Sequence, residues 1–276
     1  MVSLEQIDHV TIAASELGKL TEPLERYGFD PAYGGVHSNE VTHMSQLGFE
    51  DGTYLELIST VEPGMESPVW QSFVAQDGGA CGWAIVVDDI DEAADQFRDE
   101  GIDIDQPARY EREPDRGDRL EWTMAVPSQH IYPFLIHDRT DRRYRAKPGV
   151  GTVHTETKGI GRVVLGVEDL ESTIDAFHAL FDLGEPQRLR DTPAGLKISS
   201  YDNAPVTLVA PSEEGWLGER LDTFGPSPVG FLLRSADPDQ SRVRFGIEGT
   251  SHWGDLEIGW IPVTDREGLD DLGLVL

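Results

Sequence analysis

The stretch Ile7-Asp8-His9-Val10-Thr11-Ile12 decides the fold, together with its counterpart Tyr54-Leu55-Glu56-Leu57-Ile58. Both are short apolar runs that predict β-strands, and alternate side chains of a strand share one face. His9 is therefore expected to point away from Val10, and Glu56 away from its leucine neighbours. If the two strands lie side by side, an imidazole and a carboxylate project together from a face whose reverse is apolar. Such a pair supplies half of a metal site.

A repeated unit organises the rest of the chain. An apolar strand runs into an acidic helix start in four segments, at residues 7–17, 82–90, 160–170 and 229–238. Helical apolar spacing follows in the first three, and short strands broken by Gly, Pro and Asp follow each helix. Each unit is therefore a predicted β-α-β-β-β module, the fourth with a short helix. We expect an α+β fold of repeated modules, paired into two cupped mixed sheets with helices on the outer face.

The predicted modules group into two halves. Residues 4–138 hold the first two modules, and residues 159–276 hold the third module and the shortened fourth. The segment between them, 139–158, is basic for this chain and contains the turn sequence Pro148-Gly149-Val150-Gly151. We interpret the halves as two paired-module domains, joined by a linker that is placed to line a cleft.

The composition is strongly acidic, with a formal net charge of −29 over 276 residues. Such charge is typical of disordered chains, but the recurring periodic apolar segments argue against disorder. Self-repulsion of this size opposes compaction at ordinary ionic strength and is screened in molar salt, where the Debye length is about 3 Å. We therefore expect a folded protein from a salt-accumulating halophile. The same charge argues against a nucleic-acid partner.

Neither a membrane span nor a signal peptide is expected. No run approaches the ~18 apolar residues of a spanning helix, and the start Met1-Val2-Ser3-Leu4-Glu5 lacks a basic patch and an apolar core. The single cysteine, Cys81, leaves no internal disulfide framework and no multi-cysteine zinc site. The expected location is the cytoplasm.

Several short motifs of the first half occur in a characteristic order over residues 5–145. They are Asp8-His9-Val10, Gly34-Gly35-Val36-His37, Tyr54-Leu55-Glu56-Leu57, Gly82-Trp83-Ala84, Asp88-Asp89-Ile90-Asp91, Glu121-Trp122 and Tyr132-Pro133-Phe134-Leu135-Ile136. This layout resembles the vicinal oxygen chelate superfamily and, within it, the glyoxalase-like proteins of the glyoxalase, bleomycin resistance and extradiol dioxygenase type. The resemblance implies a cupped sheet that holds a divalent metal or a small ligand. It also implies that metal ligands come from the first and last strands of the modules.

The resemblance assigns a partial ligand set to this chain. His9 and Glu56 occupy the ligand positions of the first module, whereas the second module has Gly82 and approximately Phe134 there. With His43 on or near the second strand, His9 and Glu56 form a two-histidine, one-carboxylate set of the type that binds ferrous iron. A divalent metal (Fe, Mn, Zn or Ni) is therefore the expected cofactor. The alternative is a buried histidine–carboxylate pair without metal.

Other polar residues are candidates for catalysis or binding. Those for proton transfer are Glu56, Glu121 and His37, and those for substrate binding are Tyr54, Thr42 and Arg162. Each has a structural alternative. Glu121 suits a solvated strand edge, His37 a solvated loop, and Arg162 an ion pair with one of the many acids.

Two functions follow from these expectations. The first is a metal-dependent isomerase, lyase or dioxygenase that acts on a small oxygenated molecule. The second is a metal-free protein of the bleomycin resistance type, which binds or sequesters a small aromatic or cationic compound. In both cases the expected partner is a small molecule, and the protein is expected to be a monomer or a homodimer.

Overall fold

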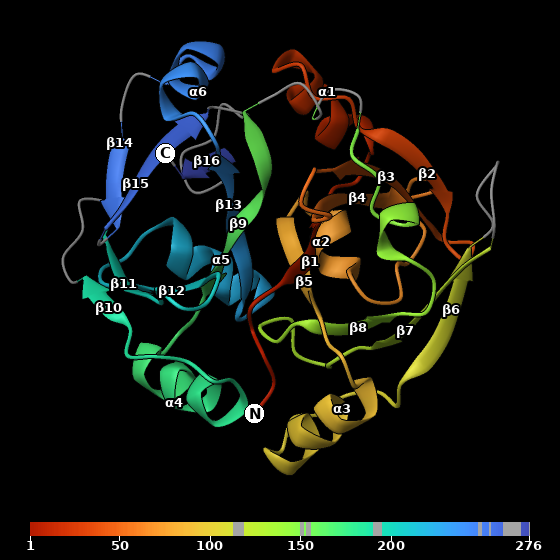
Figure 1. Cartoon of the computed structure of the whole chain (residues 1–276), viewed down its shortest axis with the longest axis horizontal. Coiled ribbons are helices and arrows are strands. Elements are labelled where there is room, and N and C mark those ends of the chain that lie inside the picture. Colours follow the sequence, from red (N-terminus) through yellow and green to blue (C-terminus); the bar gives the residue numbers. More distant parts are fainter. Residues whose placement is uncertain are drawn as a thin grey trace.

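The computed structural model describes residues 1–112, 119–149, 152, 156–189, 195–247, 250–253, 255–261 and 272–275, with the backbone alone for 260, 261 and 272–275. These residues form two eight-stranded sheets, which lie next to one another in Figure 1. The strands from β1 (red) to β8 (yellow-green) form one sheet, and those from β9 (green) to β16 (blue) form the other. The expected α+β fold of paired β-α-β-β-β modules is confirmed.

The first sheet contains the strands of the first two modules. They are β1 (Ile7–Ala13), β2 (Ala32–Val36), β3 (Thr42–Gly48), β4 (Tyr54–Thr60), β5 (Gly79–Val86), β6 (Ala108–Arg112), β7 (Leu120–Ala125) and β8 (Phe134–Asp138). Their order across the sheet is β2-β3-β4-β1-β5-β8-β7-β6. The first strands of the two modules, β1 and β5, therefore pair at the centre, and the last strand of each module lies beside its first.

The second sheet repeats this topology. Its strands are β9 (Thr157–Gly166), β10 (Gln187–Leu189), β11 (Leu196–Ser200), β12 (Val206–Pro211), β13 (Ser227–Ser235), β14 (Thr250–Trp253), β15 (Leu256–Ile261) and β16 (Leu272–Val275). They are ordered β10-β11-β12-β9-β13-β16-β15-β14, so β9 and β13 pair at the centre as β1 and β5 do.

Three of the described helices begin at predicted aspartates, whereas α1 begins after Leu17 without a side-chain cap. The α-helices are α1 (Gly18–Arg26), α2 (Gln71–Ala75), α3 (Ile90–Asp99), α4 (Leu170–Leu180), α5 (Trp216–Phe224) and α6 (Pro238–Phe245), and one 3-10 turn, η1, covers Arg142–Tyr144. The side chains of Asp89, Asp169 and Asp237 accept hydrogen bonds from the amides at the starts of α3, α4 and α6. These caps satisfy amides that a helix start leaves free. The short helix α2 and the helix α5 were not predicted.

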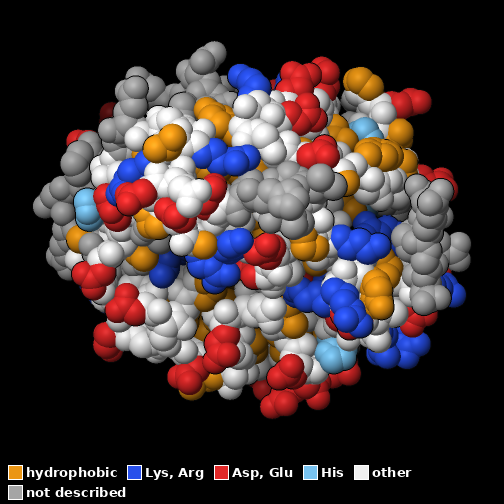
Figure 2. Space-filling view, turned by 45° about the horizontal axis from the view of Figure 1, so that its top comes forward, with side chains coloured by type: hydrophobic (Ala, Val, Ile, Leu, Met, Phe, Trp, Pro, Cys, Tyr) orange, Lys and Arg blue, Asp and Glu red, His pale blue; other side chains and the backbone are white. Residues whose placement is uncertain are grey.

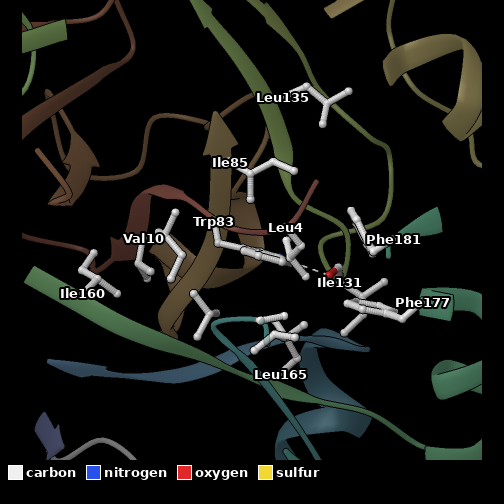
Figure 3. Close-up of a cluster of buried hydrophobic side chains, with 14 of the residues drawn as sticks. Leu4, Val10, Trp83, Ile85, Ile131, Leu135, Ile160, Leu165, Phe177 and Phe181 are labelled. Carbon is white, nitrogen blue, oxygen red and sulfur yellow. Dashed lines mark hydrogen bonds between the residues drawn. The ribbon is translucent and has the colours of Figure 1, made fainter. Parts of the chain in front are cut away.

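A single large cluster of buried side chains joins the outer faces of the two sheets (Figure 3). It contains Val10 and Trp83 from the first sheet, Leu165 from the second, and Phe97 and Phe177 from α3 and α4. Trp83 is fully buried, and its indole nitrogen donates to the Ile131 carbonyl at 3.1 Å. The opposite face of the first sheet, which we call the inner face, does not belong to this core.

The inner face of the second sheet is filled instead. Val164, Ile198, Val209 and Leu232 pack there against Leu217 and other residues of α5 in a separate apolar cluster. Acidic side chains are spread over much of the surface (Figure 2). No helix in the described part of the chain is long and apolar enough to cross a membrane.

The shared core generates a stability prediction. Phe177 is fully buried and contacts Phe181 and Tyr132, so Phe177→Ala leaves a cavity between the sheets and should lower the free energy of unfolding by about 3–5 kcal/mol. The control is Val243→Ala, because Val243 is 85% exposed and should change stability by less than about 0.5 kcal/mol. Urea unfolding in molar KCl measures both, and equal stability of the two variants would contradict the shared core.

Candidate functional site

His9 and Glu56 lie next to one another on the inner face. Strands β1 and β4 are parallel neighbours, in a register that sets Thr11 beside Glu56 and His9 beside Tyr54. The His9 Nε2 atom lies 3.6 Å from the Glu56 Oε2 atom, and the Thr11 hydroxyl donates to the same oxygen at 3.3 Å. Glu56 is 14% exposed. The carboxylate is thus held by the sheet yet open to a small molecule.

A second imidazole faces the other oxygen of the same carboxylate. His37, in the turn between β2 and β3, places its Nε2 atom 3.6 Å from Glu56 Oε1 and is 28% exposed. Its Nδ1 atom shares a hydrogen bond of 2.7 Å with the Thr42 hydroxyl, which the side chain of Asn39 also contacts. Burial alone would raise the pKa of Glu56, but the imidazoles of His37 and His9, which face its two oxygens, outweigh burial and lower the pKa to about 2. Glu56 is therefore ionised at neutral pH.

Asp8 fixes the orientation and the tautomer of His9. Its carboxylate is completely buried and accepts a hydrogen bond of 2.7 Å from His9 Nδ1. Burial would raise the pKa of Asp8, but Arg145 and His9 outweigh burial and hold the pKa far below its usual value. Because an ionised carboxylate only accepts hydrogen bonds, His9 Nδ1 carries a proton, and in the neutral form of the ring this is the tautomer that the contact selects. The Nε2 lone pair therefore faces the Glu56 carboxylate.

The arginines that compensate Asp8 come from the segment predicted as a linker. Arg145 binds Asp8 through both terminal nitrogens, at 3.0 and 2.7 Å, and also binds Asp138 and the Tyr54 hydroxyl. Arg142 donates to Asp8 and to the Gly52 carbonyl. Tyr54, a predicted substrate-binding residue, is 5% exposed and stacks on the His9 ring at 4.7 Å. It supports His9 from within the sheet.

The second module contributes aromatic and apolar groups to the inner face. Ala84 pairs with both His9 and Phe134, which places these three side chains on one face. Phe134 and Ile136 form a small apolar cluster against Trp70 and Trp122. The inner face is thus polar over the first module and apolar over the second.

Two predicted site residues, His43 and Glu121, lie on the outer face of the first sheet. His43 pairs with Ser59 on β4, one residue out of phase with Glu56, so its side chain is on the outer face, where it contacts the Tyr33 ring. Glu121 is likewise out of phase with Trp122 on β7 and pairs with Glu111. The register therefore brings neither His43 nor Glu121 together with His9 and Glu56.

Arg162 belongs to the second sheet. Its buried guanidinium donates to the carbonyls of Ala204, Val206 and Tyr201, and it approaches the Thr207 hydroxyl. These bonds satisfy the guanidinium within the protein, so Arg162 stabilises the second sheet. Thr42, predicted to bind substrate, holds His37 instead.

The residues present do not fit the expected divalent metal. Gly82 and Phe134, which stand approximately where the family resemblance expects the ligands of the second module, offer no side-chain donor atoms. In the part of the chain that the structure describes, no group of three or more His, Cys, Asp or Glu side chains is arranged to hold a metal ion. His9 and His37 each face a different oxygen of Glu56, at ion-pair distance. We therefore derive no chemical step from a metal.

Residues 7–181 match the family described as "Glyoxalase-like domain", and no curated protein matches the sequence. Similar solved structures include a hypothetical protein from Staphylococcus aureus, 11% identical, with 97% of each chain covered and a TM-score of 0.62. A mutant of 4-hydroxymandelate synthase from Streptomyces coelicolor is 14% identical, with 99% of this chain and 92% of that chain covered and a TM-score of 0.62. A xylose isomerase-like TIM barrel/4-hydroxyphenylpyruvate dioxygenase fusion protein is 12% identical over 99% of this chain and 49% of its own, with a TM-score of 0.59. These likenesses show a shared fold.

The buried ion cluster predicts a strong dependence on Arg145. Arg145→Met leaves Asp8 short of its main counter-charge and should lower the free energy of unfolding by about 3–5 kcal/mol. Adding Asp8→Asn to this variant should restore part of the loss, because the uncompensated charge is then gone. Arg143→Met, at a side chain that is 72% exposed, is the control and should cost less than about 0.5 kcal/mol. Chemical unfolding measures all four proteins, and a double variant less stable than Arg145→Met alone would contradict the cluster.

The low pKa of Glu56 predicts part of the acid sensitivity. Since the folded pKa, about 2, is below the unfolded value, ionised Glu56 stabilises the fold above pH ~4.5, and this contribution is lost as the pH falls toward 2. Glu56→Gln should remove up to roughly 3 kcal/mol of the stability change between pH 6 and pH 2. The control Gln46→Asn, opposite Glu56 on β3, should keep the wild-type slope. Urea unfolding at several pH values provides the test, and an unchanged slope in Glu56→Gln would show that the carboxyl is not held ionised.

Proposed function

The chain belongs to the glyoxalase-like domain family, and from this premise we propose that it is a proton-transferring enzyme, of the isomerase or lyase type, that acts on a small carbonyl compound with an apolar body. One observation carries the proposal. Two imidazole Nε2 atoms flank the Glu56 carboxylate, each 3.6 Å from one of its oxygens. The part of the inner face beside them, over the second module, is apolar.

His9 is the proposed proton acceptor. With its proton held on Nδ1 by Asp8, the neutral ring presents the Nε2 lone pair to the inner face. The ionised Asp8 stabilises the imidazolium that forms when Nε2 takes a proton, as a buried carboxylate does behind other catalytic histidines. The Nε2 lone pair and the Glu56 carboxylate are both acceptors. A ligand that places an acidic hydrogen between them is therefore favoured.

Glu56 and His37 complete the proposed chemistry. A proton leaves the carbon next to the substrate carbonyl for His9 Nε2, and the C–H electron pair moves toward the carbonyl oxygen to give an enolate. Glu56 stays ionised and stabilises the imidazolium, which returns the same proton to the neighbouring carbon. The more exposed His37 accepts the hydroxyl proton of the enediolate and gives a proton to the former carbonyl oxygen, so that both histidines end as they began. For an α-hydroxy ketone these two transfers give the isomeric α-hydroxy aldehyde.

A second candidate is a binding protein without catalysis. The apolar cluster of Trp70, Trp122, Phe134 and Ile136 favours it, because these groups supply contact area for a planar ligand and no chemistry. The acidic surface and the ionised Glu56 suit a ligand that is neutral or cationic.

Hydrogen exchange tests the catalytic proposal directly. Wild-type protein in molar KCl and D₂O should exchange the CH₂ hydrogens of 2-hydroxyacetophenone faster than buffer, measured by proton NMR. His9→Gln should lower the enzymatic rate at least about 100-fold, because a positioned general base contributes roughly 10²–10⁴-fold. His43→Gln is the matched control, because His43 lies on the outer face, and it should stay within about two-fold of wild type.

Two results would contradict the proposal. Binding of the ketone without exchange above buffer would favour the binding protein. The second result would come from metal analysis of protein purified without chelators, compared with His9→Ala and Glu56→Gln. Stoichiometric metal that both variants lose, with exchange that depends on it, would replace this proposal by a metal-dependent mechanism.

A further inference from the structure

Trp70 carries a buried hydrogen-bond donor at the edge of the proposed site. Its indole Nε1 atom is shielded from solvent and has no hydrogen-bond partner among the described residues. Buried donors are nearly always satisfied, because an unpaired one costs free energy. An acceptor brought by a ligand would satisfy this group.

The position of Nε1 relates it to the polar half of the inner face. A Cβ atom placed on Gly82 would lie 3.3 Å from Trp70 Nε1 and 3.7 Å from the Thr11 hydroxyl oxygen. Thr11 in turn donates to Glu56. The indole nitrogen therefore lies next to Gly82, on the face that holds the carboxylate.

Gly82 makes room for this arrangement. Any side chain at this position in β5 would start within contact distance of the indole nitrogen. The ring itself stacks on Phe134, with centroids 6.1 Å apart and planes 28° from parallel. Trp70 thus presents an apolar face to the aromatic cluster and its N–H to the neighbourhood of Glu56.

We propose that Trp70 is a substrate-binding residue whose indole N–H binds the carbonyl oxygen of a neutral aryl ketone with an acidic hydrogen on the adjacent carbon. This substrate class, which rests on the proposed function, matches both halves of the site. The carbonyl takes the Trp70 donor, and the acidic hydrogen lies toward His9 and Glu56. The aryl ring stacks in the apolar cluster, and the charge of Glu56 discriminates against carboxylate ligands. The same N–H stabilises negative charge as it develops on the carbonyl oxygen.

The test uses full-length protein with ¹⁵N-labelled tryptophan indoles and two probes. The probes are 2-hydroxyacetophenone and 1-phenyl-1,2-ethanediol, which has hydroxyls but no carbonyl. The Trp70 indole resonance is identified by its absence in Trp70→Phe, a variant that keeps an aromatic ring against Phe134. We expect this resonance to move downfield with the ketone. We also expect the ketone Kd to rise about five-fold in Trp70→Phe, since a hydrogen bond contributes about 1 kcal/mol net, with the diol Kd unchanged.

Two further variants sharpen the result. Gly82→Ala, which crowds the indole nitrogen, should reproduce the selective loss of ketone binding even if Trp70→Phe is poorly folded. Trp216→Phe, at the start of α5 on the second sheet, should bind both probes like wild type. Equal weakening of ketone and diol would show that Trp70 only packs and would overturn the proposal. An unmoved Trp70 resonance, or no ketone binding by wild type, would overturn it as well.

The readouts separate this inference from the catalytic proposal. Ketone binding that depends on Trp70, without hydrogen exchange, leaves Trp70 as a binding residue of a non-catalytic protein. Exchange that depends on His9 but is unchanged in Trp70→Phe and Gly82→Ala supports the enzyme and removes Trp70 from its site.

Discussion

The interaction on which the rest of the site depends is the charge on Asp8. A completely buried carboxylate is costly unless it is paired, and here Arg145, Arg142 and His9 surround it. That pairing sets the tautomer of His9 and anchors the chain after β8 to the first strand. Through His9 it also determines what faces Glu56. The arrangement of His9 and Glu56 on the inner face therefore depends on a buried ion cluster beneath it.

The two modules of the first sheet contribute different groups to the inner face. The first provides the imidazoles and the carboxylate, and the second provides the aromatic cluster beside them. In the second sheet, the same topology has its inner face filled by Val164, Leu232 and the residues of α5. The inner face is thus accessible in the first sheet and covered in the second, while the outer faces of both sheets form the shared core.

The fold was more predictable than the site. Period-two and helical apolar patterns predicted the modules, and the acidic residues after three of the strands predicted the aspartate caps of α3, α4 and α6, because both follow from local chemistry and burial. The same alternation correctly predicted that His9 and Glu56 share a face. It could not predict the faces of His43 and Glu121, because these depend on strand register, which no local pattern fixes. Asp8 escaped prediction because β1 carries an extra residue between the pairs Ile7–Ile85 and His9–Ala84, and such a bulge breaks the alternation. Trp70 precedes a five-residue helix that no periodicity marks.

The ties between Asp8 and the arginines bear on how the chain is divided. Arg142 and Arg145 follow β8, and the carbonyl of Lys147 lies so close to Gly48 that a side chain on that glycine would collide with it. A fragment cut at residue 138 would hold all eight strands of the first sheet and still lack both counter-charges of its innermost acid. A fragment that keeps Asp8 neutralised must therefore reach at least Arg145, and the core of the first sheet extends further, into α4 and the second sheet.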